Sequence, residues 1–125
     1  MAEPFKPGTA ARASADYETI YSDPLTISAG EELTLGQRDD EWPGWIWCVN
    51  RAGKGGWAPE RWIEERGDGS GVARQDYTAA ELPLRAGDTL TLHAEESGWY
   101  WATNAAGRSG WVPRTHIVLE EMIDR

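Results

Sequence analysis

The sequence predicts an all-β protein built from two tandem small β-barrels joined by a short linker. Three observations lead to this prediction: the chain repeats itself over most of its length, apolar residues alternate with polar ones in short runs, and 14 glycines and 7 prolines are spread between those runs. Alternation with period two is typical of half-buried strands, and scattered Gly and Pro are typical of tight turns. A chain of 125 residues can hold one ordinary domain or two very small ones, and the repeat favours two.

The repeat is clearest in the second half of each copy. Residues 45–63 read WIWCVNRAGKGGWAPERWI and residues 99–117 read WYWATNAAGRSGWVPRTHI, and these blocks align without a gap and share nine of 19 positions. Two shorter blocks precede them: GEELTL at 30–35 corresponds to GDTLTL at 87–92, and ASADY at 13–17 corresponds to ARQDY at 73–77. Copies this short bury little surface as an open sheet, so each is predicted to close into a barrel.

The repeat also sets the predicted domain boundaries. We predict a flexible tail over residues 1–11, a first barrel over 12–64, a linker over 65–71, a second barrel over 72–119 and a C-terminal tail over 120–125. The spans 12–64 and 72–119 are called the first repeat and the second repeat below. The linker is polar and rich in glycine, a composition typical of a flexible connection.

Strand alternation predicts which side chains form the cores. In the aromatic strands that begin at Trp45 and Trp99, Cys48 and Ala102 face inward. The tryptophans that lie two residues after Trp45 and Trp99 face the other way. Those tryptophans, Trp47 and Trp101, either extend a binding surface or contact the other barrel. Trp57 and Trp111 are predicted to pack on the barrel rather than to face a ligand. The predicted core residues are Ala13, Leu25, Leu33, Leu35, Cys48, Ala58, Ile63, Ala73, Leu82, Leu90, Leu92, Ala102, Val112 and Ile117.

Four motifs occur in the same order in both repeats. Each repeat begins with Ala-x-x-Asp-Tyr and continues with Gly-acidic-x-Leu-x-Leu. A strand led by tryptophan follows, and the repeat ends with Gly-aromatic-x-Pro-x-x-aromatic-Ile at residues 56–63 and 110–117. In order and composition these motifs resemble SH3 domains, of the divergent kind found in bacterial proteins, over nearly the whole chain.

The resemblance implies a shallow aromatic groove in each barrel for extended, proline-rich peptides. A polyproline helix is ordered before it binds, aromatic faces contact its prolines, and acidic loops contact a flanking Arg or Lys. The resemblance places the first groove at Tyr17, Trp45, Pro59 and Trp62, and the second at Tyr77, Glu81, Trp99, Pro113 and His116. Both repeats depart from the family, because Ala15 and Gln75 replace one groove tyrosine and His116 replaces another ring.

Charge favours the first repeat as the main ligand-binding unit. It carries a net charge of −6 over residues 13–64, against −1 over residues 72–119. The predicted acidic rim consists of Asp23, Asp39, Asp40 and Glu41, with Trp42 as an additional loop aromatic. Fixed carboxylates accept charge-assisted hydrogen bonds from guanidinium, so the expected partner is a proline-containing or Arg/Lys-rich segment of a protein. The alternative is that these acids only solvate a loop.

Composition argues against several other functions. A net charge of −9 disfavours binding to nucleic acid or to an anionic membrane. No Cys or His pair has metal-ligand spacing and no phosphate-loop motif occurs, so neither a metal nor another cofactor is expected. Cys48 has no histidine near it in sequence, and a non-catalytic protein is therefore predicted. The N-terminus lacks the apolar core of a signal peptide, which favours a cytoplasmic location.

Two further functions and one structural question stay open at this point. The chain is alternatively a scaffold or accessory subunit that packs on a larger enzyme, or a cell-wall module that recognises peptidoglycan, as SH3-like domains of bacteria often do. The oligomeric state is not predicted. Residues Pro4–Pro7 have the spacing of a proline ligand, and a disordered tail is the simpler interpretation.

Overall fold

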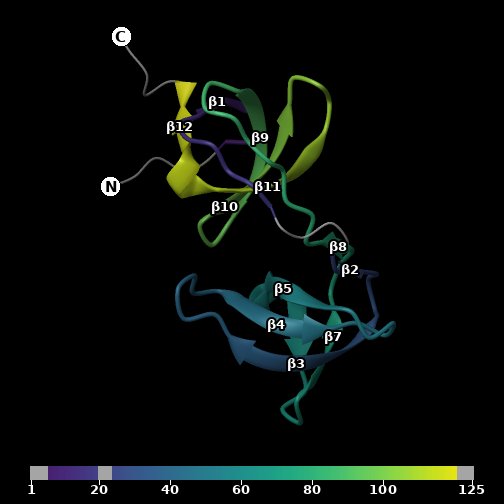
Figure 1. Cartoon of the computed structure of the whole chain (residues 1–125). Coiled ribbons are helices and arrows are strands. Elements are labelled where there is room, and N and C mark those ends of the chain that lie inside the picture. Colours follow the sequence, from purple (N-terminus) through teal and green to yellow (C-terminus); the bar gives the residue numbers. More distant parts are fainter. Residues whose placement is uncertain (1–5, 20–23, 121–125) are drawn as a thin grey trace. The chain divides into compact units, whose positions relative to one another are not determined.

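The chain folds into two compact units that do not coincide with the two repeats. The computed structural model describes residues 6–19 and 24–120 (Figure 1). Unit 1 consists of residues 1–22 together with 81–125, and unit 2 consists of residues 23–80. Both units are made of antiparallel strands, and the helices in the described residues are two three-residue 3₁₀ turns, which confirms the predicted all-β class. No helix within the described part of the chain is long and apolar enough to cross a membrane.

Unit 2 is a barrel whose main sheet has the strand order β5-β4-β3-β7-β6. Its strands are β3 (Glu32–Arg38), β4 (Trp45–Val49), β5 (Gly55–Pro59), β6 (Ile63–Glu65) and β7 (Ser70–Ala73). The 3₁₀ turn η1 (Glu60–Trp62) connects β5 to β6. A separate short pair joins β2 (Thr26–Ile27) to β8 (Tyr77–Thr78).

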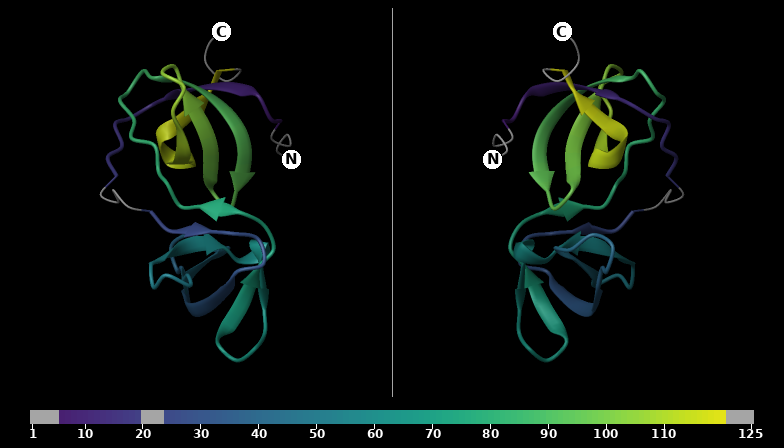
Figure 2. Two further views of the ribbon diagram at one scale, coloured as in Figure 1. Left: turned by 90° about the vertical axis from the view of Figure 1, so that its right-hand side faces the viewer. Right: turned by 90° about the vertical axis from the view of Figure 1, so that its left-hand side faces the viewer.

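Unit 1 repeats this architecture with the strand order β11-β10-β9-β1-β12. Its strands are β1 (Thr9–Ala13), β9 (Thr89–Glu96), β10 (Trp99–Asn104), β11 (Ser109–Pro113) and β12 (Ile117–Leu119). The 3₁₀ turn η2 (Arg114–His116) connects β11 to β12. Both views of Figure 2 show the purple β1 beside the green and yellow strands of this barrel.

The first strands of the two repeats are exchanged. In β1, Arg12 of the first repeat pairs with Thr89 of β9 and with Val118 of β12, and both partners belong to the second repeat. In β7, Val72 of the second repeat pairs with Glu32 of β3 and with Glu64 of β6, and both partners belong to the first repeat. Each barrel is therefore completed by a strand from the other repeat.

This arrangement differs from the predicted domain boundaries, and the predicted linker supplies the reason. Residues 65–71 are not a flexible connection: they form the end of β6, the start of β7 and the turn between them, in which Gly67 and Gly69 have φ of +82° and +86°. The Arg66 N–H donates to the Ser70 carbonyl at 3.0 Å, and Asp68 accepts from the Ser70 N–H at 3.0 Å. Closing this short loop instead of one spanning a whole repeat saves about 2 kcal/mol of chain entropy. The predicted N-terminal tail is also shorter than expected, because Thr9–Ala11 lie in β1.

The predicted core is otherwise confirmed. All fourteen predicted residues are buried except Leu35 and Ile117, which are half-buried. The exchange changes which core each first strand enters: Ala13 packs in unit 1 with the leucines of β9, and Ala73 lies on β7 in unit 2. The core residues that the prediction missed are Ala11, Ile27, Trp45, Ile46, Tyr77, Leu84 and Trp111.

The exchange predicts crossed effects for two matched substitutions. Ala13→Asp buries an unpaired carboxylate in unit 1 and is expected to cost that unit about 3–5 kcal/mol. Ala73→Asp does the same to unit 2. The eight tryptophans report on each unit separately, because five lie in residues 23–80 and three in residues 81–125.

In NMR spectra, Ala13→Asp should remove the dispersed indole signals of Trp99, Trp101 and Trp111, and Ala73→Asp should remove those of the other five tryptophans. If each repeat formed its own barrel, the two sets of losses would be reversed.

Candidate functional site

An aromatic cluster in unit 1 is built around Tyr17. Tyr17 lies in the segment after β1 and exchanges two backbone hydrogen bonds with Leu84, at 2.9 and 2.8 Å. The Tyr17 ring meets Trp99 edge-on at 6.2 Å between ring centroids, and it meets His116 edge-on at 5.4 Å. The Tyr17 hydroxyl donates to Oε1 of Glu81 at 2.6 Å. Three half-buried rings and one carboxylate thus lie together, and they are called the unit 1 cluster below.

Local sequence explains why Trp99 and His116 reach Tyr17. Trp99 begins β10 and pairs with Pro113, the last residue of β11. Pro113 has φ of −75° and ψ of 138°, and it leads directly into η2, which presents His116. The Arg114 N–H donates to the Gly98 carbonyl at 3.0 Å and ties this turn to the start of β10. The Gly-aromatic-x-Pro motif therefore positions both rings.

The equivalent aromatic cluster of unit 2 is built around Tyr77. Its ring meets Trp62 of η1 edge-on at 5.5 Å, and its hydroxyl donates to the Trp57 carbonyl at 2.8 Å. Trp45 pairs with Pro59 across β4 and β5, as Trp99 pairs with Pro113 in unit 1. Trp45 and Tyr77 are only 5% and 8% exposed, whereas Trp62 is half-buried.

The predicted groove sets are corrected at their tyrosines. The structure brings Trp45, Pro59 and Trp62 together with Tyr77, and it brings Trp99, Pro113 and His116 together with Tyr17. Each tyrosine lies four residues after an exchanged strand, so it follows that strand into the barrel of the other repeat. Glu81 likewise bonds Tyr17 rather than belonging with Tyr77.

The predicted acidic rim of the first repeat is only partly available to a ligand. The Asp39 carboxylate accepts from the backbone N–H groups of Glu41 and Trp42 at 2.8 and 3.2 Å, so it shapes the loop. Asp40 and Glu41 are exposed and Trp42 is half-buried. Asp23 lies outside the described residues.

The charge difference between the repeats does not carry over to the folded units. Unit 2 contains eleven acidic and six basic residues, and unit 1 contains ten acidic and six basic residues. The predicted imbalance of −6 against −1 thus becomes −5 against −4. Charge no longer singles out one groove.

A buried carboxylate near the unit 1 cluster was missed by the sequence interpretation. Glu96 is 5% exposed and pairs with Trp99 across the turn between β9 and β10. Ser97 in that turn has φ of +47°, the left-handed region that non-glycine residues seldom occupy. The acidic run Glu95-Glu96 gave no signal that one member is buried.

The remaining tryptophans pack in pairs within each barrel. Trp47 meets Trp57 edge-on at 5.4 Å across β4 and β5, and Trp101 meets Trp111 in the same way across β10 and β11. A Cβ at Gly55 would lie 2.5 Å from Cζ2 of Trp47, so glycine is what admits that ring. Trp111 is buried and Trp57 half-buried, in keeping with the predicted scaffold role.

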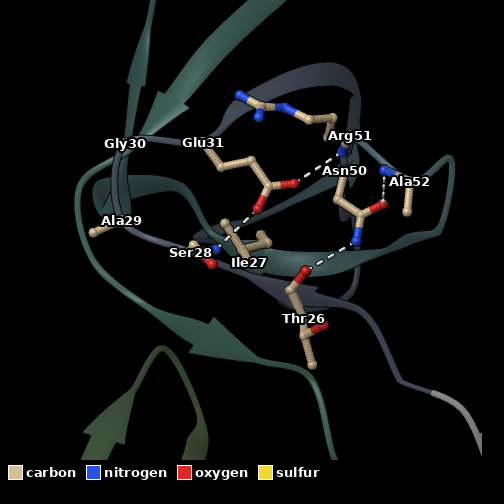
Figure 3. Close-up of a pocket in the computed structure, with 9 residues that line it drawn as sticks. All are labelled: Thr26, Ile27, Ser28, Ala29, Gly30, Glu31, Asn50, Arg51 and Ala52. Carbon is tan, nitrogen blue, oxygen red and sulfur yellow. Dashed lines mark hydrogen bonds between the residues drawn. The ribbon is translucent and has the colours of Figure 1, made fainter.

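A surface hollow of about 540 Å³ lies elsewhere in unit 2 (Figure 3). Its lining comes from residues 26–31 and 50–52, and none of the predicted groove residues takes part. Glu31 accepts from the backbone N–H groups of Ser28 and Arg51 at 3.0 and 2.9 Å, and these bonds lower the pKa of its carboxyl. The Asn50 amide donates to the Thr26 carbonyl at 2.9 Å. These polar side chains are engaged in holding two turns together.

Cys48, the one cysteine of the chain, is enclosed in unit 2. Cys48 is a free cysteine with no exposed surface, and burial raises the pKa of its thiol to about 11. Within residues 6–19 and 24–120, no group of three or more His, Cys, Asp or Glu side chains is placed to hold a metal ion. Cys48 is therefore part of the packing of unit 2.

Comparison with known protein families finds a match in each repeat. The variant SH3 domain family matches residues 10–66, and the SH3 domain family matches residues 72–114. A search of curated proteins finds no match to the chain.

The buried thiol predicts a specific pH dependence. The native thiol keeps its proton up to a pH of about 11, whereas the unfolded thiol ionises near 9.0. The stability that Cys48 contributes is therefore complete below pH 9 and is lost as the pH rises from 9 toward 11. Denaturant titrations should show the native chain losing stability over this interval by more than a Cys48→Ala variant does. At pH 8 an aromatic disulfide reagent should react with Cys48 only when the chain unfolds, and immediate reaction of the native chain would contradict the burial.

Proposed function

Because this chain consists of two tandem SH3-family domains, and such domains are non-catalytic modules that bind proteins or peptides, we propose that it is an adaptor recognising a proline-containing segment with a basic residue. The observation that supports this proposal is the unit 1 cluster, where aromatic rings and a carboxylate lie side by side. Aromatic faces bind proline rings, and the ordered polyproline helix loses little entropy on binding.

The unit 1 cluster offers chemistry for both parts of such a ligand. Trp99 and His116 are half-buried, so each ring keeps part of its surface accessible. The Glu81 carboxylate accepts one hydrogen bond from Tyr17 at 2.6 Å, and a carboxylate has further lone pairs for a guanidinium or ammonium group. The Tyr17–Glu81 bond also fixes the carboxylate beside the rings, so little side-chain entropy is lost when a ligand binds.

The groove of unit 2 supports a second site of related chemistry. Trp62 and Trp42 are half-buried, and the exposed Asp40 and Glu41 lie in the loop that leads to Trp45. This is the groove that the sequence favoured. The unit 1 cluster has the more accessible tyrosine and tryptophan, since Trp45 and Tyr77 are buried, and we therefore assign it the larger part of peptide binding.

A titration of the full-length chain with proline-rich peptides, with and without flanking arginine, tests this function. We expect saturable NMR shifts at the Trp99 indole and at the backbone amides of Tyr17 and His116. Trp99→Ala should abolish these shifts while the Trp101 and Trp111 indoles stay dispersed, which controls for folding. Glu81→Gln should weaken binding of the arginine-containing peptide about fivefold and leave the arginine-free peptide almost unchanged.

Trp62→Ala serves as the matched variant for unit 2. If Trp62→Ala and not Trp99→Ala abolishes binding, the groove of unit 2 is the peptide site. If no peptide shifts either groove at millimolar concentration, the adaptor function is wrong and the chain is better explained as an accessory subunit that binds folded partners.

A further inference from the structure

The two exchanged strands differ at one buried position that faces equivalent surroundings. Ala11 of β1 pairs with Leu90 and Leu119, and Gly71 of β7 pairs with Leu33 and Glu65, which stand at the corresponding positions of the other repeat. Ala11 is 1% exposed and Gly71 is also buried. Position 11 and position 71 thus occupy the same place in two barrels.

Unit 2 is too crowded at this place to take a methyl group without a shift of its neighbours. A Cβ on residue 71 would lie 2.7 Å from Cγ2 of Ile63, 3.0 Å from the backbone oxygen of Glu64 and 3.1 Å from Cδ1 of Leu35. The Glu64 oxygen belongs to the strand that β7 pairs with, and the β-branched Ile63 side chain is restricted at χ1. A strand carrying alanine here, as β1 does, can enter this barrel only if Ile63 moves and the neighbouring atoms give way by a few tenths of an ångström.

Unit 1 uses the methyl group at the same place. Ala11 belongs to its buried core with Ala13, Leu90 and Leu92, and Ile117 packs against that core. A strand carrying glycine here would leave a methyl-sized void in a core that is otherwise closely packed, and such voids are destabilising. The two barrels therefore prefer different strands.

We propose that Ala11 and Gly71 are the specificity-determining residues that assign each first strand to the barrel of the other repeat. In the unexchanged arrangement, the Ala11 methyl group would clash with the residues around position 71 in unit 2. At the same time, Gly71 would leave a methyl-sized void in the core of unit 1. The assignment also decides which tyrosine enters each groove, because Tyr17 follows β1 and Tyr77 follows β7. It holds whether or not the grooves bind peptides.

A double-mutant cycle in the full-length chain tests this assignment. It asks whether adding Ala11→Gly to Gly71→Ala raises or lowers the thermal midpoint. Gly71→Ala should lower the thermal midpoint and weaken the dispersed indole signals of the unit 2 tryptophans. Ala11→Gly alone should cause a smaller loss, confined to the signals of Trp99, Trp101 and Trp111. The double variant matches the unexchanged arrangement, so its midpoint should lie above that of Gly71→Ala.

Independent effects would give the opposite order. Substitutions in separate cores are expected to add, which would place the midpoint of the double variant below that of Gly71→Ala. Ala10→Gly is the matched control, because Ala10 lies on β1 and is exposed; it should not raise the midpoint of Gly71→Ala. The proposal is overturned if the double variant is the less stable, if Ala10→Gly rescues equally well, or if Gly71→Ala is as stable as the natural chain.

A second readout identifies the strand arrangement directly. When Ala13→Asp is added to the rescued double variant, it should remove the indole signals of Trp45, Trp47, Trp57 and Trp62. Continued loss of the Trp99, Trp101 and Trp111 signals would show that the strands are still exchanged and that residues 11 and 71 do not decide their placement.

Discussion

The pairing of β1 with β9 and β12 is the interaction on which the rest of unit 1 depends. Without β1, the strands β9 and β12 would each expose an unpaired edge, and the core would lose Ala11 and Ala13. The same segment carries Tyr17 into the cluster with Trp99 and His116. The barrel and its aromatic cluster therefore depend on the same segment, which lies far from the other strands of unit 1 in the sequence.

Unit 2 reaches the same architecture with a continuous segment. In unit 2, β7 follows β6 through a short hairpin instead of through a long connection. Residues 23–80 therefore form one barrel, although β7 belongs to the second repeat. Because β7 pairs within unit 2, it cannot also pair with β9 and β12 in the second repeat. The vacancy between β9 and β12 is filled by β1, and steric fit at residues 11 and 71 agrees with the same choice.

The exchange also gives each aromatic cluster residues from both repeats. The two SH3 family matches cover continuous spans, residues 10–66 and 72–114, each within one stretch of the sequence. In the folded protein, the tyrosine of each aromatic cluster comes from one repeat, and the tryptophan and proline come from the other. A substitution of Tyr17 or Tyr77 therefore changes the cluster that holds the tryptophan and proline of the other repeat.

Sequence alone determined the all-β class, the two barrels and most of their cores, since alternation in segments such as Leu33–Leu35 and Leu90–Leu92 depends only on neighbouring residues. It also indicated that Pro59 and Trp62, and likewise Pro113 and His116, lie close together, because each pair belongs to one local motif at η1 or η2. Only the tertiary structure decided which first strand enters which barrel, and with it the partners of Tyr17, Tyr77 and Glu81. Both strands lead into the same Ala-x-x-Asp-Tyr motif, so the motif does not say which strand enters which barrel. That choice depends on the four-residue turn at 66–69 and on a few tenths of an ångström around Gly71. Neither feature can be read from a repeat or a motif.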